Sequence, residues 1–144
     1  GAAFVVITGG EPLHHNLTGL CKCIRETTKN KSNKSIPIHI ETSGVDVMTG
    51  NPDWVTLSPK SHAPPKEDIL KCCDELKVII HEPKDLTFAE NMAQEIKINS
   101  KKNVLLFMQP GWGNKKGEAL AYEYVRNNPQ WKLSMQTHKW LGIR

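Results

Sequence analysis

The sequence predicts an α/β fold in which mostly parallel strands form an open or partial barrel. Five apolar, strand-like runs each stop in a short polar or glycine-containing cluster, at residues 8–12, 41–44, 58–60, 109–112 and 136–139. Because the carboxyl ends of parallel strands share one face of a sheet, these clusters are expected to meet around one ligand site. Gly, Pro and Ser end strands in many proteins. These clusters, however, also contain Glu, Thr, Lys, Gln or His shortly after each strand. Such side chains favour a ligand-binding site over ordinary strand ends.

Strands and helices are expected to alternate along the chain. Near-continuous runs of Val, Ile and Leu, typical of strands buried on both faces, predict strands near 4–8, 36–41, 54–57, 76–80, 103–109 and 132–136. Apolar residues at helical spacing predict helices near 13–28, 66–73, 86–99 and 115–127. The connection 45–53 is too short for a crossover helix. The chain is also shorter than the roughly 250 residues of a complete eight-stranded barrel.

Length and composition limit the class of protein. The 144 residues are expected to form a single domain, 1–144, and a net charge of +4 is only mildly basic. The densest basic stretch, 29–34, has no aromatic residue, so we expect a solvated loop there rather than a nucleic-acid groove. No apolar run is long enough to span a membrane, and no secretory leader is visible.

The four cysteines do not have the spacing of a metal site. Cys21 and Cys73 continue apolar helical stripes, and no C-x-x-C or Cys/His pairing of the zinc type is present. We therefore expect reduced thiols in a cytoplasmic protein.

Several cluster residues suit a polar small molecule. Gly9 and Gly10 leave backbone groups open to a ligand, and Glu11 adds an acceptor for an ammonium or hydroxyl group. Lys60 suits a carboxylate, and His138 suits a heterocycle. Each has a structural alternative, namely an ordinary strand-to-helix turn, a surface lysine or a structural histidine.

Taken together, the clusters resemble the 7-carboxy-7-deazaguanine synthase family of the radical S-adenosylmethionine (radical SAM) superfamily. The likeness runs from Phe4 to the last residue and rests on 8–12, 41–44, 58–60, Gln109-Pro110 and the tail 136–144. Many members of the superfamily share the Gly-Gly-Glu-Pro element, including activating enzymes of glycyl-radical proteins. The tail is much more specific to the deazaguanine branch.

The resemblance implies a lyase with defined chemistry. Such enzymes use a reduced 4Fe-4S cluster to cleave S-adenosylmethionine, and the resulting radical abstracts a hydrogen from 6-carboxy-5,6,7,8-tetrahydropterin. Ring contraction with loss of ammonia, assisted by Mg²⁺, gives 7-carboxy-7-deazaguanine for queuosine in transfer RNA and other 7-deazapurines. A cytoplasmic homodimer is implied as well, with an electron donor such as flavodoxin and no direct contact with nucleic acid.

By motif match, the resemblance assigns two groups of binding residues. S-adenosylmethionine would be held by Gly9, Gly10, Glu11, Gly44, Ser58, Pro59, Lys60, Gln109, Pro110, Gly111 and Trp112. The pterin would be bound by Thr42, His138 and the terminal carboxylate of Arg144.

The sequence departs from the family at the cluster site. The superfamily holds its cluster with C-x-x-x-C-x-x-C after the first strand, ahead of Gly-Gly-Glu-Pro, and neither this motif nor the nearby Mg²⁺ ligands are present in this sequence. The cysteines at 21, 23, 72 and 73 have the wrong spacing to replace it. We therefore expect a barrel without its first strand and cluster loop, and no catalytic or metal-ligating residue in these 144 residues. Such a polypeptide would be inactive in radical chemistry.

Three interpretations remain open. The first is the larger C-terminal part of a deazaguanine synthase. The second is another radical enzyme, such as a glycyl-radical enzyme activase, which the tail disfavours. The third is a non-catalytic nucleoside-binding domain. A C-x-x-x-C-x-x-C motif encoded upstream of Gly1 would favour the first two, whereas a start codon at Gly1 would favour the third.

Overall fold

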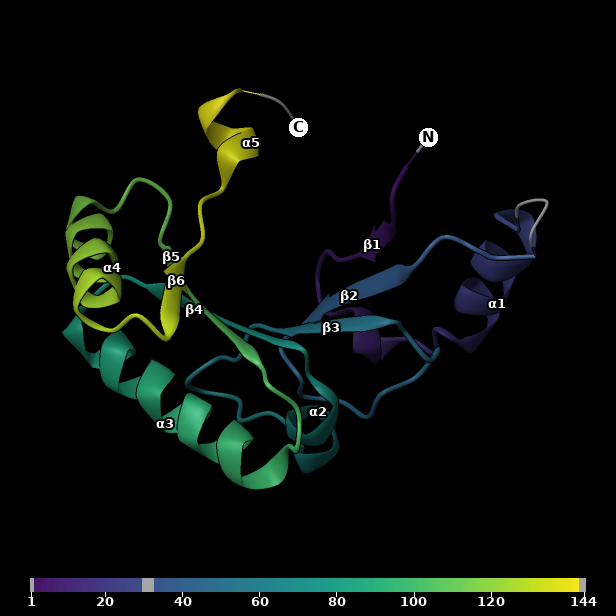
Figure 1. The fold of residues 1–144 in the computed structure, drawn as a ribbon, viewed down its shortest axis with the longest axis horizontal. Coiled ribbons are helices and arrows are strands. Elements are labelled where there is room, and N and C mark those ends of the chain that lie inside the picture. Colours follow the sequence, from purple (N-terminus) through teal and green to yellow (C-terminus); the bar gives the residue numbers. More distant parts are fainter. Residues whose placement is uncertain (1, 30–32, 143–144) are drawn as a thin grey trace.

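The computed structural model describes residues 2–29 and 33–142 and contains one six-stranded parallel sheet (Figure 1). Its strands are β1 (Val5–Ile7), β2 (Ile38–Thr42), β3 (Trp54–Leu57), β4 (Glu75–Ile80), β5 (Leu105–Pro110) and β6 (Trp131–Leu133). They lie side by side in sequence order, and every neighbouring pair is parallel. A sheet whose strand order never reverses is a barrel wall rather than a doubly wound sheet. The predicted partial barrel is therefore confirmed.

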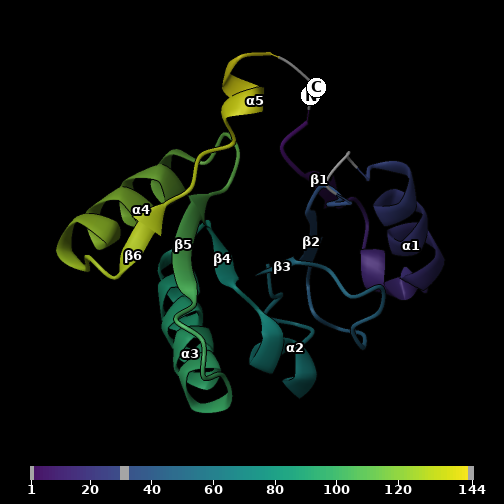
Figure 2. The same cartoon turned by 45° about the vertical axis from the view of Figure 1, so that its right-hand side comes forward.

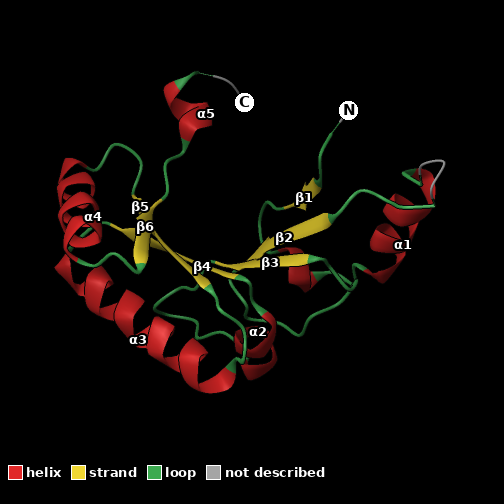
Figure 3. Cartoon of the chain, viewed as in Figure 1, coloured by secondary structure: helices red, strands yellow, loops and turns green. Residues whose placement is uncertain are grey.

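Four helices cover the outer side of the curved sheet, as Figures 1 and 2 show. They are α1 (Thr18–Thr27), α2 (Glu67–Cys72), α3 (Pro83–Asn99) and α4 (Lys115–Asn127). The short helix α5 (Thr137–Trp140) lies apart from them, on the open side of the sheet (Figure 3). The connection from β2 to β3 contains no helix, as predicted. Within the two described ranges, no helix has the length and apolarity needed to cross a bilayer.

The hydrophobic core lies between the sheet and its outer helices. Alternate residues of the strands are fully or almost fully buried there, among them Ile38, Ile40, Leu57, Leu76, Val78 and Ile80. The residues between them on β2 and β4 are only partly buried. The expectation that these strands are buried on both faces was therefore wrong. The second face carries charged side chains because it lines an open cavity.

The first helix is shorter than its apolar pattern predicted. The range 13–28 divides into a 3-10 turn, η1 (Pro12–His14), and α1, which begins at Thr18. Between them Asn16 Oδ1 accepts a hydrogen bond from Thr18 N (3.0 Å), and Thr49 Oγ1 accepts one from Leu17 N (3.0 Å). Side chains thus satisfy backbone donors that a continuous helix would have used, so the helix restarts after Asn16.

Gly117→Ala is expected to lower the free energy of unfolding by about 2 kcal/mol, although alanine normally stabilises a helix by about 1 kcal/mol over glycine. A Cβ on Gly117 would lie 2.2 Å from Ile80 O, so α4 would have to move away from the end of β4. Denaturant unfolding measures the change.

The matched control is Gly19→Ala in α1, where an added Cβ meets nothing within 4 Å. This variant is expected to be neutral or slightly stabilising. Equal effects of the two substitutions would contradict the close contact between α4 and β4.

Candidate functional site

Backbone hydrogen bonds hold the strand-end clusters beside one another. Ser58 N donates to Thr42 O (2.7 Å), which joins the ends of β2 and β3. Gly111 N donates to Ile80 O (2.9 Å), which joins the ends of β4 and β5. Because the strands are parallel, these ends form one rim of the sheet. The clusters predicted from the sequence do meet along this rim.

Glu11 links the end of β1 to the end of β2. Its Oε1 accepts hydrogen bonds from Leu13 N (3.1 Å) and Thr42 Oγ1 (2.5 Å). Its Oε2 accepts one from Ser43 N (2.7 Å) and another from Ser43 Oγ. Thr42 Oγ1 in turn accepts from Gly44 N (3.0 Å). The carboxylate is thus engaged within the chain, and its contact with a ligand stays a prediction.

The hydrogen bonds also fix the charge of Glu11. Burial raises the pKa of this carboxyl, but the hydrogen bonds from Ser43 and Thr42 outweigh it and hold the pKa below the ordinary value. The carboxylate is therefore ionised at neutral pH, which strengthens each of these bonds.

The glycine turn after β1 faces open space. Gly9 and Gly10 have φ angles of +91° and +56°, which residues with a Cβ rarely adopt, and a Cβ at either would meet nothing within 4 Å. Gly44 differs, because a Cβ there would lie 2.8 Å from both Leu57 Cδ1 and Pro65 Cβ. The backbone of Gly9 and Gly10 is therefore open to a ligand, whereas Gly44 is required by close packing.

A cavity of about 440 Å³ lies on the face of the sheet opposite the core, a volume typical of small-molecule sites. Its lining comes from β2, β4 and β5, from the residue that follows β3 and from the tail, namely Glu41, Ser58, Glu75, Lys77, Ile79, Gln109, Ser134, Met135, Gln136 and His138. Three predicted site residues, Ser58, Gln109 and His138, are brought together here.

The base of this cavity is charged, which sequence reasoning missed. Lys77 Nζ lies 2.6 Å from Glu41 Oε1, and Glu75 lies on the same face of β4 as Lys77. Burial raises the pKa of Glu75, although the nearby Lys77 charge opposes that change. The available signal was the alternation of Glu75 and Lys77 with the apolar Leu76 and Val78, which indicates a polar strand face.

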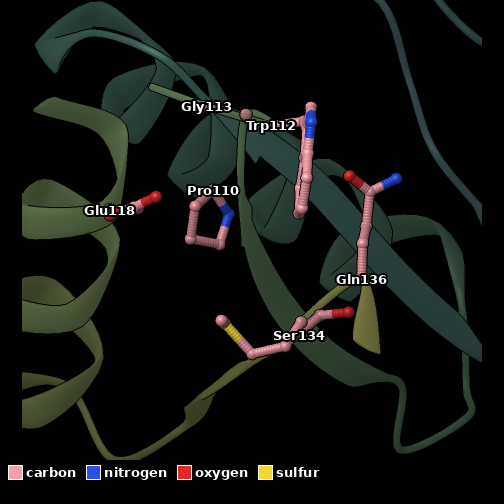
Figure 4. A pocket seen from close by; sticks show the side chains of 8 residues that line it. Pro110, Trp112, Gly113, Glu118, Ser134 and Gln136 are labelled. Atoms are coloured by element: carbon pink, nitrogen blue, oxygen red, sulfur yellow. The ribbon is translucent and has the colours of Figure 1, made fainter. Parts of the chain in front are cut away.

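A smaller pocket of about 20 Å³ adjoins the cavity and shares its residues 134–136. Its other wall is formed by Pro110 at the end of β5 and by Gly111 and Trp112 in the loop that follows. Figure 4 shows Trp112 and Gln136 on the same side of this pocket, while Glu118 reaches it from α4. Lys139 Nζ lies 5.3 Å from the Trp112 ring centroid, a cation–π contact that ties the tail to this loop.

The remaining predicted site residues line neither of these two spaces. They are Gly9, Gly10, Glu11, Thr42, Gly44, Pro59 and Lys60. Thr42 is only 3% exposed. Lys60 is partly buried, and its carbonyl accepts a hydrogen bond from Ala63 N (3.1 Å). Arg144 lies outside the described residues.

The cysteines do not fit a 4Fe-4S cluster. Burial raises the thiol pKa values of Cys21, Cys72 and Cys73, to about 12 for Cys73, which disfavours the thiolate that ligates iron. Cys23 is exposed on α1. Across residues 2–29 and 33–142, no group of three or more His, Cys, Asp or Glu side chains could hold a metal ion.

A partial parallel barrel with its polar clusters along one strand-end rim defines a radical-SAM type of fold. No family model matches the chain. It is 56% identical over 155 aligned residues to "7-carboxy-7-deazaguanine synthase" of Prochlorococcus marinus, covering 99% of this chain and 69% of that protein. It is 41% identical over 142 residues to the protein of the same name from Synechocystis sp., covering 99% and 63% respectively. The chain belongs to the 7-carboxy-7-deazaguanine synthase family.

A solved structure agrees with this assignment. The crystal structure of QueE from Escherichia coli matches 94% of this chain and 57% of its own, with a TM-score of 0.78 and 27% sequence identity. The chain thus spans between 57% and 69% of the lengths of these three relatives. The family, fold class and enzyme class predicted from the sequence are confirmed.

Proposed function

We propose that the intact enzyme containing this chain converts 6-carboxy-5,6,7,8-tetrahydropterin to 7-carboxy-7-deazaguanine by radical ring contraction. The observation that carries this proposal is the polar cavity on the open face of the sheet, in a chain that is 56% identical to a protein named for this product. When bound, S-adenosylmethionine and a 4Fe-4S cluster supply the radical chemistry. The names of the relatives favour this function over an activase or a nucleoside-binding domain.

In this proposal the chain binds S-adenosylmethionine along the strand-end rim. The open backbone of Gly9 and Gly10 suits the polar methionine end of the cofactor. Trp112, half exposed beside the smaller pocket, offers a flat face to its adenine ring. The cluster and Mg²⁺ require ligands that the described residues do not supply.

The pterin is proposed to lie in the larger cavity. His138 lines it from α5, and its ring nitrogens can hydrogen-bond the heterocycle. For Thr42 and Arg144 the family resemblance is the only support, because Thr42 is almost fully buried and Arg144 lies outside the described residues. An external electron donor, a homodimeric assembly and a cytoplasmic location are part of the proposal on the same resemblance.

Anaerobic turnover tests this function directly. The intact enzyme, supplied with reductant, S-adenosylmethionine and the carboxylated tetrahydropterin, is expected to form 7-carboxy-7-deazaguanine in repeated cycles. Omitting S-adenosylmethionine should abolish the product. Cleavage of S-adenosylmethionine without consumption of the pterin would contradict the proposal and favour another radical enzyme.

Lys60→Ala in the intact enzyme is expected to weaken S-adenosylmethionine binding by about 1.5–3 kcal/mol, the usual value of a hydrogen bond to a charged group. The physical reason is the loss of an ammonium three residues after the end of β3, where it can pair with the cofactor carboxylate. Equilibrium dialysis or calorimetry measures the affinity. Lys66→Ala removes an exposed lysine from the same loop and should leave it unchanged. Equal affinities of both variants would make Lys60 an ordinary surface lysine.

A further inference from the structure

An ion pair whose lysine is mostly shielded from water lies in the lining of the larger cavity. The Lys77 side chain is 14% exposed, and its Nζ lies 2.6 Å from Oε1 of Glu41, which is 39% exposed. Removing a lysine ammonium from water is costly, and such pairs often contribute little net stability compared with apolar side chains of the same size. Stability alone therefore does not account for Lys77 on this face.

The strand register determines which groups surround this pair. Glu41 lies opposite Thr56, and Thr56 lies opposite Glu75, so the two carboxylates occupy one row of the same sheet face. Lys77 lies two residues further along β4 and contacts Glu41 across the intervening strand β3. Among the residues that the structure describes, other titratable groups on this side include His39, His138, Lys139 and Lys132; the Lys132 ammonium lies 5.9 Å from the Phe107 ring centroid.

The two oxygens of Glu41 have different surroundings. Oε1 is held by the Lys77 ammonium. Among the described residues, Oε2 accepts a long hydrogen bond of 3.4 Å from the exposed Thr8 Oγ1. Since Glu41 lines the cavity, Oε2 retains capacity to accept a hydrogen bond from a ligand.

We propose that Lys77 is a positioning residue that holds the Glu41 carboxylate so that its Oε2 accepts a hydrogen bond from a ring N–H of the bound heterocycle. Lys77 itself makes no contact with the ligand and acts through Glu41. This inference rests on the proposed function, because it names how the same cavity recognises the ring of its substrate. The proposed hydrogen bond to Glu41 recognises the heterocyclic ring of the ligand and not its carboxylate.

A double-mutant cycle in the intact enzyme tests the proposal. The variants are Glu41→Gln, Lys77→Met and the double substitution, and the probes are the carboxylated substrate and a neutral pterin without the carboxylate. Each single variant is expected to bind both pterins about tenfold or more weakly. The double variant should bind about as weakly as Glu41→Gln alone, because Lys77 acts only through Glu41. Lys77→Arg should retain most of the affinity, and S-adenosylmethionine affinity should not change.

Each alternative outcome has a defined meaning. Multiplied losses in the double variant, or a loss with Lys77→Met confined to the carboxylated pterin, would show that Lys77 contacts the ligand directly and would overturn the proposal. Unchanged binding in Lys77→Met would overturn it as well. If Lys77→Met alone does not fold, the double variant can be used in its place, because it carries neither charge. The pterin affinities of the double variant, Glu41→Gln and Lys77→Arg then decide whether Lys77 acts through Glu41. Failure of the proposed function gives a different result. The wild-type enzyme would then show no turnover, while the double-mutant cycle would still give the expected affinities for the neutral pterin.

Discussion

Glu11→Ala is expected to lower the free energy of unfolding by about 3 kcal/mol and to abolish turnover in the intact enzyme. The Glu11 carboxylate accepts hydrogen bonds from Leu13, Thr42 and Ser43, and its removal leaves partly buried donors without an acceptor. A hydrogen bond to a charged group contributes about 1.5–3 kcal/mol, and water can replace part of that loss. Urea unfolding measures the stability, and anaerobic turnover measures the activity.

Acid should remove the same contribution. The folded-state pKa of Glu11 lies below its ordinary value of 4.5. The stabilisation is therefore complete above the unfolded pKa and is lost as the pH falls through the lower, folded pKa. Glu11→Ala should accordingly show a weaker loss of stability between neutral pH and this acidic range than the wild type.

Two comparison variants sharpen the Glu11 experiment. Glu11→Gln keeps the shape but loses the charge and places an amide donor beside donors, so its stability should be intermediate. Glu26→Ala removes a glutamate that is 59% exposed and 4.0 Å from Lys22, and should change stability by less than about 0.5 kcal/mol. A Glu11→Ala enzyme as stable as the Glu26→Ala enzyme would show that the hydrogen bonds of Glu11, which link β1 to β2, contribute little to the free energy of unfolding.

Features encoded over short stretches of sequence could be predicted. The apolar run Trp54–Leu57 was predicted with the bounds that the structure has, because a strand and the Ser-Pro-Lys cluster that ends it are both local signals. The shared rim followed from a general property of parallel sheets rather than from any single residue. The partial barrel followed from the same alternation and from the chain length.

Contacts between distant segments could not be predicted in the same way. The family resemblance assigned Thr42 to the substrate, and this assignment stays a prediction, but the sequence did not show that the Thr42 hydroxyl donates to Glu11, 31 residues away, or that Thr42 is almost fully buried. Lys77 resembles an ordinary solvated lysine in the sequence. Only the strand register brings it to Glu41, 36 residues away, on a half-open face. The role of a polar residue here depends on which strand becomes its neighbour.

The 144-residue polypeptide, reconstituted with iron and sulfide without oxygen, is expected to show no 4Fe-4S absorbance and no cleavage of S-adenosylmethionine. Its cysteines are divided between α1 and the end of α2, with Cys73 directly after that helix, and the two helices lie at different places on the outer side of the sheet in Figures 1 and 2. Burial also keeps Cys21, Cys72 and Cys73 as thiols by raising their pKa values. Ultraviolet–visible absorbance, iron content and 5′-deoxyadenosine formation measure the outcome.

The matched comparison extends the same polypeptide upstream with a segment that carries C-x-x-x-C-x-x-C, and this form should gain both the cluster and the cleavage activity. Since the chain's own cysteines are not ligands in this view, replacing Cys23 and Cys72 with serine in the extended form should leave its iron content unchanged. Stoichiometric iron in the 144-residue form, lost when Cys72 or Cys73 becomes serine, would instead place the cluster ligands at the end of α2. The fold would then have to rearrange, because Cys73 is fully buried where it lies and burial raises the pKa of its thiol.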